Sequence, residues 1–481
     1  MISLGDRPDP ARVQAVAVLS QFRRGFYDSL TRRADALFEL TDALLCADGP
    51  VTSLAELSLD LVHRRGHGAM YDALAEGRLD VTRLRVALAG LDLPRGADRQ
   101  LTIALDVTPW PRPDAECSPE RLHCHRPCRC DGVRQTIPGW PYQVAVALEG
   151  GRSSWTWPLD VMRLGPDDDP TAVTAAQIRA LVARLTQAGQ WRRGDPPILF
   201  VLDAGYDVMR LSWLLRKVPV RLLGRVRADR VLYGPAGRRR GDWPGRPPRH
   251  GDVFRLADPA THPMPAQTST STHDRFGAVV ARCWGWLHPK LERRGSWAEH
   301  PGQLPIVAGT LVHLGVERLP GDRDPKPLWL WYSHPDATAV EVDRLWRIFL
   351  RRFDLEHTFR FCKQTLGLTR PRLRSPAQAD RWAWLIVVVY TQLRLARGLA
   401  ADLRRPWERP VPPERLSPCR VRRGYRRLRR VLGSPASAPK PSRPGPGRPK
   451  GRRSIPALRH SVGKQQRKPA ISQLSQTTEK G

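Results

Sequence analysis

Four side chains near residue 350 are spaced so that they could act together. On a helix, at about 100° per residue, they fall within a sector of roughly 60°. A carboxylate on a partly apolar face, with one cation a turn before it and another two turns after it, suits a metal ion and a polyanion. The same spacing also fits a surface ion-pair ladder from Arg352 to Glu356. The four residues are Phe349, Arg352, Glu356 and Lys363.

Two more carboxylates stand in apolar runs that read as β-strands. Asp106 lies in LTIALDVTPW, and Asp203 follows PPILFVL. A carboxylate inside an apolar strand costs roughly several kcal/mol unless it is paired or binds a metal ion. Each Asp taken alone could also be a strand-end residue that caps a turn. Together with Glu356, the two Asp residues offer the hard oxygen ligands that Mg²⁺ or Mn²⁺ prefers over zinc.

The elements that must position these groups follow one another from residue 99. Three strand-like runs are followed by a helix from Thr171 to Gly189, a strand ending at Asp203, a short helix and a fifth strand over 220–229. Much later comes a helix from Thr338, which has capping-box spacing with Glu341, to a stop at Gly367. We expect an α/β protein with a mixed sheet.

That last helix is predicted to be continuous and largely buried. Its apolar residues recur near helical spacing, and Phe361 falls outside the apolar stripe. Asp207, four residues after Asp203, is expected to cap the next helix and not to bind metal. The stripe consists of Leu345, Ile348, Phe349, Phe353, Phe359 and Leu366.

The order of strands and helices resembles that of a ribonuclease-H-like fold. In such folds the first and fourth strands present neighbouring acidic residues and a later helix delivers a third, and these positions are held by Asp106, Asp203 and Glu356. Phe349-x2-Arg352-x3-Glu356-x6-Lys363 also resembles the Y-x2-R-x3-E-x6-K signature of bacterial insertion-sequence transposases of the DDE superfamily. Phe349 replaces the signature's Tyr, so that hydroxyl is absent. LDAGYD, around Asp203, resembles the family's second-carboxylate motif.

The resemblance implies a DNA transposase that cleaves the ends of an insertion sequence and joins them to a target. Asp106, Asp203 and Glu356 would be the catalytic residues and would hold two Mg²⁺ (or Mn²⁺) ions about 3.5–4 Å apart. Arg352 and Lys363 would bind DNA phosphates. A homodimer is expected in the DNA complex, because two ends must be held together. The alternatives are a ribonuclease-H-like DNA nuclease without strand transfer and a non-catalytic DNA-binding protein derived from a transposase.

Composition supports a polyanionic partner. The chain of 481 residues has a formal net charge of +32, with far more Arg than Lys. Double-stranded DNA is the leading partner and an anionic membrane surface the second. The apolar run from Ala383 to Tyr390 is too short to span a bilayer, and the first residues lack the apolar segment of a signal peptide. The cysteines do not suggest a secreted disulfide framework. We expect a cytoplasmic, nucleoid-associated protein.

Five parts are expected along the chain. Residues 1–95 read as a helical domain, which could bind DNA ends or serve packing or dimerisation. Residues 96–229 form the first part of the catalytic core, 230–335 a β-rich insertion, and 336–410 the catalytic helix and a C-terminal helix of the core. Residues 411–481 lose apolar periodicity and read as a basic, mostly disordered tail.

Three features of these parts have two interpretations each. A Trp of the insertion could stack on a displaced base, as in the resembling family, or belong to the core; the candidates are Trp284, Trp286, Trp297, Trp329 and Trp331. Arg448 lies in PGRPKG, which resembles an AT-hook but also fits nonspecific phosphate binding. A cluster between the first two strands has zinc-ligand types without a zinc spacing, so a reduced loop is the alternative. Its members are Cys117, His123, Cys124, His125, Cys128 and Cys130.

Overall fold

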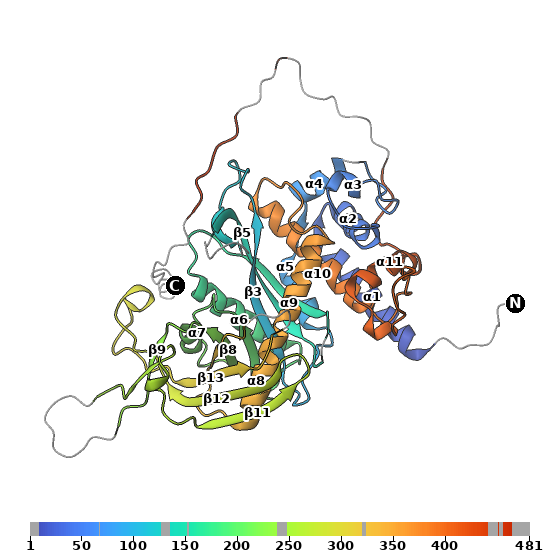
Figure 1. Cartoon of the computed structure of the whole chain (residues 1–481). Coiled ribbons are helices and arrows are strands. Elements are labelled where there is room, and N and C mark those ends of the chain that lie inside the picture. Colours follow the sequence, from blue (N-terminus) through green and yellow to red (C-terminus); the bar gives the residue numbers. More distant parts are fainter. Residues whose placement is uncertain are drawn as a thin grey trace, which may run out of the picture.

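The computed structural model describes residues 9–66, 68–126, 135–151, 153–237, 248–319, 324–440, 451 and 456–463. A group of helices packs beside a large sheet (Figure 1). Arg448, Cys128 and Cys130 lie outside the described residues, as does most of the predicted tail beyond residue 440. No helix in the described ranges combines the length and the apolar character needed to cross a lipid bilayer.

Five core strands lie in the order β6-β5-β3-β7-β8 within a larger mixed sheet. β5 pairs antiparallel with β3 and β6, whereas β7 runs parallel to both β3 and β8. This order and these directions confirm the ribonuclease-H-like fold. The five strands are β3 (Thr102–Pro111), β5 (Gln135–Leu148), β6 (Thr156–Arg163), β7 (Ile198–Leu202) and β8 (Val220–Val226). A further strand, β4 (Leu122–Arg126), pairs with β5.

Two helices make the parallel crossovers. α6 (Pro170–Gln187) joins β6 to β7, and α7 (Val208–Leu214) joins β7 to β8. Asp169 starts α6 by accepting hydrogen bonds from the backbone N–H groups of Thr171 and Ala172. Asp207 starts α7 in the same way, as the sequence predicted, by accepting from the N–H of Arg210. β7 is buried along its whole length, which accounts for its continuous apolar sequence.

The β-rich region before the catalytic helix continues the same sheet. β14 (Leu328–Tyr332) pairs antiparallel with β8, and β13 (Gly309–Val316), β12 (Gly277–Leu287) and β11 (Gln267–His273) follow outward. A separate two-stranded sheet joins β9 (Val231–Tyr233) to β10 (Val253–Arg255). The outermost strand, β11, was not foreseen, because QTSTSTH contains no apolar alternation.

The helix predicted over 338–367 is divided at Arg352, so the prediction of one continuous helix was wrong. α8 (Ala339–Arg351) begins at the predicted capping box of Thr338 and Glu341, and α9 (Phe353–Gln364) follows. The N–H of Arg352 donates to Phe349 O at 3.1 Å, and the N–H of Leu355 donates to Arg352 O at 3.0 Å. These i to i−3 bonds overwind the helix locally.

The overwound turn also changes which face of α9 is buried. Phe353 is 49% exposed and Phe361 is buried, both contrary to the predicted stripe. Leu345, Phe349 and Leu366 are buried as predicted. A single helical period therefore describes α8 but does not continue into α9.

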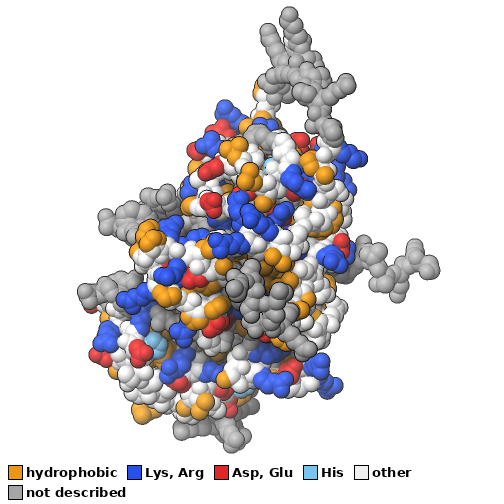
Figure 2. Space-filling model, turned by 90° about the vertical axis from the view of Figure 1, so that its right-hand side faces the viewer, with side chains coloured by type: hydrophobic (Ala, Val, Ile, Leu, Met, Phe, Trp, Pro, Cys, Tyr) orange, Lys and Arg blue, Asp and Glu red, His pale blue; other side chains and the backbone are white. Residues whose placement is uncertain are grey.

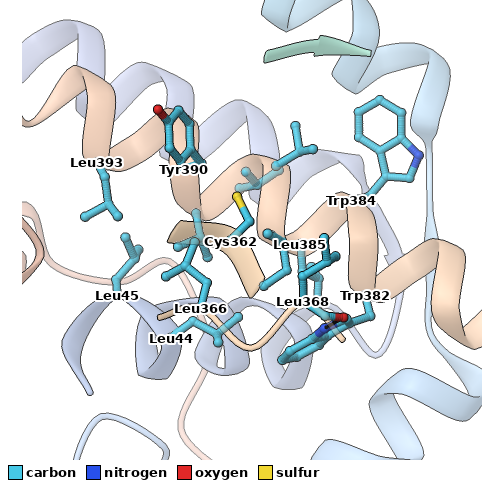
Figure 3. Packing of buried hydrophobic residues seen from close by; sticks show 14 of the residues in the cluster. Leu44, Leu45, Cys362, Leu366, Leu368, Trp382, Trp384, Leu385, Tyr390 and Leu393 are labelled. Carbon is cyan, nitrogen blue, oxygen red and sulfur yellow. Dashed lines mark hydrogen bonds between the residues drawn. The ribbon is translucent and has the colours of Figure 1, made fainter. Parts of the chain in front are cut away.

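The first helices pack with the last ones to form one helical part. α10 (Pro376–Leu395) is buried on nearly every side and contacts β6, α1 and α2. Figure 3 shows Leu44 and Leu45 of α2 meeting Cys362 and Leu366, together with side chains of α10. The N-terminal elements are α1 (Pro10–Ser29), β1 (Leu30–Arg32), α2 (Ala34–Cys46), α3 (Leu54–Leu57), α4 (Gly68–Glu76), β2 (Arg78–Leu79) and α5 (Val81–Ala89).

The first part of the predicted disordered tail is folded. α11 (Pro418–Leu432) packs on α2 and α10, with Val421 and Tyr425 fully buried. Arg422 donates to the carbonyls of Leu44 and Gly49, and Arg426 to that of Cys46. The carbonyls of Leu44 and Cys46 lie in the last turn of α2, where a helix leaves acceptors unpaired, and that of Gly49 lies in the segment that follows. The Arg residues that hid the helical pattern in the sequence are thus part of the packing.

Candidate active site

The two predicted Asp residues lie side by side because of strand register. β3 and β7 are parallel, and Leu105 lies opposite Leu202. The next residues along the two strands are Asp106 and Asp203, which therefore occupy neighbouring positions on the sheet. Glu356 comes from the first turn of α9.

All three carboxylates converge on Arg352. Its Nη1 lies 2.8 Å from Asp106 Oδ2, and its Nη2 lies 3.7 Å from Asp203 Oδ2 and 3.5 Å from Glu356 Oε1. Arg352 is only 5% exposed. The Arg352–Glu356 pair is therefore one contact of a four-residue cluster. It is not part of a surface ion-pair ladder, which was the alternative interpretation of the sequence.

Burial dominates the electrostatics of Asp106. It raises the pKa of this carboxyl to about 6, although the positive charge of Arg352 and a hydrogen bond from Val107 oppose the rise. The Val107 N–H donates to Asp106 Oδ1 at 2.8 Å. Asp203 and Glu356 raise the pKa further, because two nearby negative charges disfavour a third.

The donor set fits a divalent cation in its chemistry. Asp203 Oδ1 is buried and has no hydrogen-bond partner among the described residues, and Arg352 Nε is in the same condition. A buried carboxylate oxygen without a hydrogen-bond partner is suited to bind a cation. With the side chains as they lie, no three His, Cys, Asp or Glu residues in the described ranges are grouped to hold one ion. The carboxylates meet around a guanidinium.

Lys363 and Phe349 are the other two residues of the predicted set. Lys363 is half-buried two turns after Glu356, and burial lowers its pKa while Asp106 opposes the change. Phe349 is 4% exposed, and its ring centroid lies 6.0 Å from the Arg352 guanidinium carbon. Phe349 therefore packs beside Arg352, in keeping with its lack of a hydroxyl.

Sequence reasoning missed a tyrosine behind the two Asp residues. Tyr206 donates to Gln143 Oε1 at 3.2 Å, and Gln143 in turn donates to Gln177 at 2.6 Å. Burial and then the charge of Asp106 raise the pKa of Tyr206 well above its usual value. The signal was present, because Tyr206 lies in the LDAGYD motif that contains Asp203.

Five Lys and Arg residues follow Glu356 along the chain, between residues 360 and 374. They are exposed, apart from the half-buried Lys363. None of them has a side-chain ion pair among the described residues. Arg112, which donates to Leu373 O at 2.6 Å, has its pKa lowered by burial and by the nearby Arg121 and Arg372. We call this set the basic row: Arg360, Lys363, Arg370, Arg372 and Arg374.

Most tryptophans of the β-rich region belong to the core. Trp284, Trp329 and Trp331 are buried, and Trp297 is half-buried. Trp286 differs from them, because it is 53% exposed and has a positive φ of 59°. Bulky side chains rarely adopt that backbone conformation.

The Cys and His cluster does not form a metal site in the described residues. Cys117 and Cys124 are free thiols, and Cys124 is buried in β4 beside β5. Burial raises the pKa of Cys124 to about 11, so this thiol stays protonated near neutral pH.

A family model described as DDE superfamily endonuclease matches residues 25–281, just over half of the chain. The match covers Asp106 and Asp203 and ends before Glu356. No curated protein matches the chain.

Proposed function

The chain belongs to the DDE superfamily endonuclease family, and from this premise we propose that it is a DNA transposase that cleaves and joins the ends of an insertion sequence. The convergence of Asp106, Asp203 and Glu356 on one point, from two strands and a helix, carries the proposal. Such a set of carboxylates suits phosphoryl transfer on DNA, because it can hold metal ions beside the scissile phosphate.

We propose that Asp106, Asp203 and Glu356 hold two Mg²⁺ or Mn²⁺ ions. When bound, the ions would lower the pKa of the attacking water or 3′-hydroxyl and stabilise the leaving oxygen. The strands fix the two Asp side chains beside each other, and α9 presents Glu356 to them. Asp106 must be ionised to serve as a ligand, so the cation has to overcome the burial that raises its pKa to about 6.

DNA phosphates would lie along the basic row. Lys363 stands two turns from Glu356, and Arg370, Arg372 and Arg374 are exposed on the following loop. On the face seen in Figure 2, Lys and Arg side chains outnumber Asp and Glu. Arg352 would contact a phosphate once its present ion pairs are released, and Arg448 would add a tail contact to DNA.

The proposed transposase works as a homodimer on two DNA ends, in the cytoplasm at the nucleoid.

The deciding experiment incubates the protein with labelled end DNA, Mg²⁺ and a plasmid. Short inverted repeats that flank the gene would supply the end sequence. Joining of the label to the plasmid supports a transposase, whereas cleavage without joining identifies a nuclease. Binding without cleavage identifies a non-catalytic DNA-binding protein.

A further inference from the structure

One guanidinium lies within 4 Å of three carboxylates that come from separate elements. The three carboxylates can carry three negative charges in total, whereas Arg352 carries one positive charge. Asp106 receives the shortest contact, at 2.8 Å, while Asp203 and Glu356 lie at 3.7 and 3.5 Å. Like charges held this close repel one another, so the cluster needs a cation to stay together.

Two buried atoms of the cluster are left without partners. Asp203 Oδ1 and Arg352 Nε both lack a hydrogen bond among the described residues. A guanidinium cannot satisfy every oxygen of three carboxylates, because its donors lie in one plane. A divalent cation accepts oxygen ligands from several directions and could therefore use Asp203 Oδ1.

We infer that Arg352 is a positioning residue that gathers Asp106, Asp203 and Glu356 before metal ions bind, and that divalent ions bind by taking over its contacts. The inference rests on the proposed metal-dependent function. Since the guanidinium and the ion are attracted to the same three carboxylates and their positive charges repel each other, each weakens the binding of the other. Loading of the ions then frees Arg352 for a DNA phosphate.

The local backbone suits such a release. Arg352 stands at the junction of α8 and α9, where the regular i to i−4 bonds are interrupted. Its guanidinium carbon lies 5.6 Å from the ring of Phe353 and 6.0 Å from that of Phe349. The guanidinium therefore has two aromatic rings nearby in addition to the carboxylates, and these ring contacts do not depend on its ion pairs.

The test measures Mn²⁺ binding to the full chain by electron paramagnetic resonance, together with Tm with and without Mn²⁺. Arg352→Gln should lower the Tm of the metal-free protein by roughly 3–5 °C, because the carboxylates lose their counter-ion. The same variant should bind Mn²⁺ about tenfold more tightly than the wild type. Mn²⁺ should also raise its Tm more than that of the wild type.

Two further variants complete the test. Arg351→Gln removes the neighbouring ion pair with Asp354, 3.2 Å long, and should leave Mn²⁺ affinity unchanged. Arg352→Lys keeps the charge but not the planar fork, so its Mn²⁺ affinity should lie between those of the wild type and Arg352→Gln. If Arg352→Gln does not fold, Arg352→Lys decides, and it must bind Mn²⁺ more tightly than the wild type.

The possible failures are distinguishable. Mn²⁺ binding by the wild type that Arg352→Gln leaves equal or weakens would overturn the inference and leave the proposed function intact. Absence of Mn²⁺ binding in the wild type and in both Arg352 variants would overturn the proposed metal site and the inference with it.

Discussion

Asp106 accepts a hydrogen bond from Arg352 at 2.8 Å, yet burial still raises the pKa of this carboxyl to about 6. The folded protein therefore holds the Asp106 proton in a pH range where the unfolded chain, with an ordinary pKa of 3.8, has lost it. In that range the folded state binds more protons than the unfolded state, so stability falls as pH rises.

The first prediction follows from this sign. Compared with Asp106→Asn, the metal-free wild type should lose roughly 1–3 kcal/mol of unfolding free energy between about pH 4 and pH 7. Urea unfolding of both proteins across this range measures the difference. The Asn variant cancels the contributions of the other titrating groups, and a difference that stays constant with pH contradicts the prediction.

Glu356→Gln should abolish Mg²⁺-dependent cleavage of end DNA while DNA affinity at matched salt persists. The amide keeps the size of the side chain but removes the charge that a divalent ion needs. Asp354→Asn is the matched control, because Asp354 lies in the same turn of α9 and pairs with Arg351 outside the carboxylate cluster. Cleavage that continues in Glu356→Gln removes this residue from the site.

Arg372→Ala should weaken DNA binding and reduce the slope of log affinity against log salt by about 1. The reason is that each phosphate contact releases a counter-ion. Arg193→Ala is the control, because this exposed Arg precedes the start of β7, at the opposite end of the strand from Asp203. Equal losses in both variants would indicate that the positive charge of the whole molecule, and not the basic row, attracts DNA.

Trp286→Gly should separate stability from DNA binding. Gly adopts the positive φ of 59° without strain, so the variant should be as stable as the wild type or more stable by up to about 1 kcal/mol. If Trp286 stacks on a displaced base, the binding free energy of Trp286→Gly for end DNA with an unpaired base should weaken by roughly 1–3 kcal/mol.

Trp331→Ala, at a fully buried position, is the control and should instead destabilise the fold by roughly 3–5 kcal/mol. Unchanged affinity of Trp286→Gly for that DNA would exclude stacking by this residue.

Arg422→Ala should lower the free energy of unfolding by roughly 1–3 kcal/mol, because the carbonyls of Leu44 and Gly49 lose their donor. Arg427→Ala, exposed on the same helix, should change it by less than about 0.5 kcal/mol. Chemical denaturation compares the two. Similar values for both would mean that the hydrogen bonds of Arg422 to α2 and the segment after it contribute little to stability.

The core strands and the places of the three carboxylates could be predicted from the sequence, because apolar runs and the residues that interrupt them are local signals. Asp106 and Asp203 stood out as charged residues in apolar strands. The division at Arg352 could not be predicted, since the partners of this guanidinium, on β3 and after β7, are far from it in the sequence. α11 was hidden because its buried apolar residues are separated by Arg side chains whose partners lie on α2 and in the segment that follows it.

The way in which α8 and α9 pack on the sheet has a mechanical consequence. Asp106 lies in β3 and Asp203 just after β7, and the helix pair that carries Glu356 spans the sheet. α8 packs on β8, β11 and β12, and α9 packs on β3 and β6. Glu356 therefore stands on a helix that touches the strand of Asp106, and a load on the outer strands would pass through α8 and the junction at Arg352 before it reached this carboxylate.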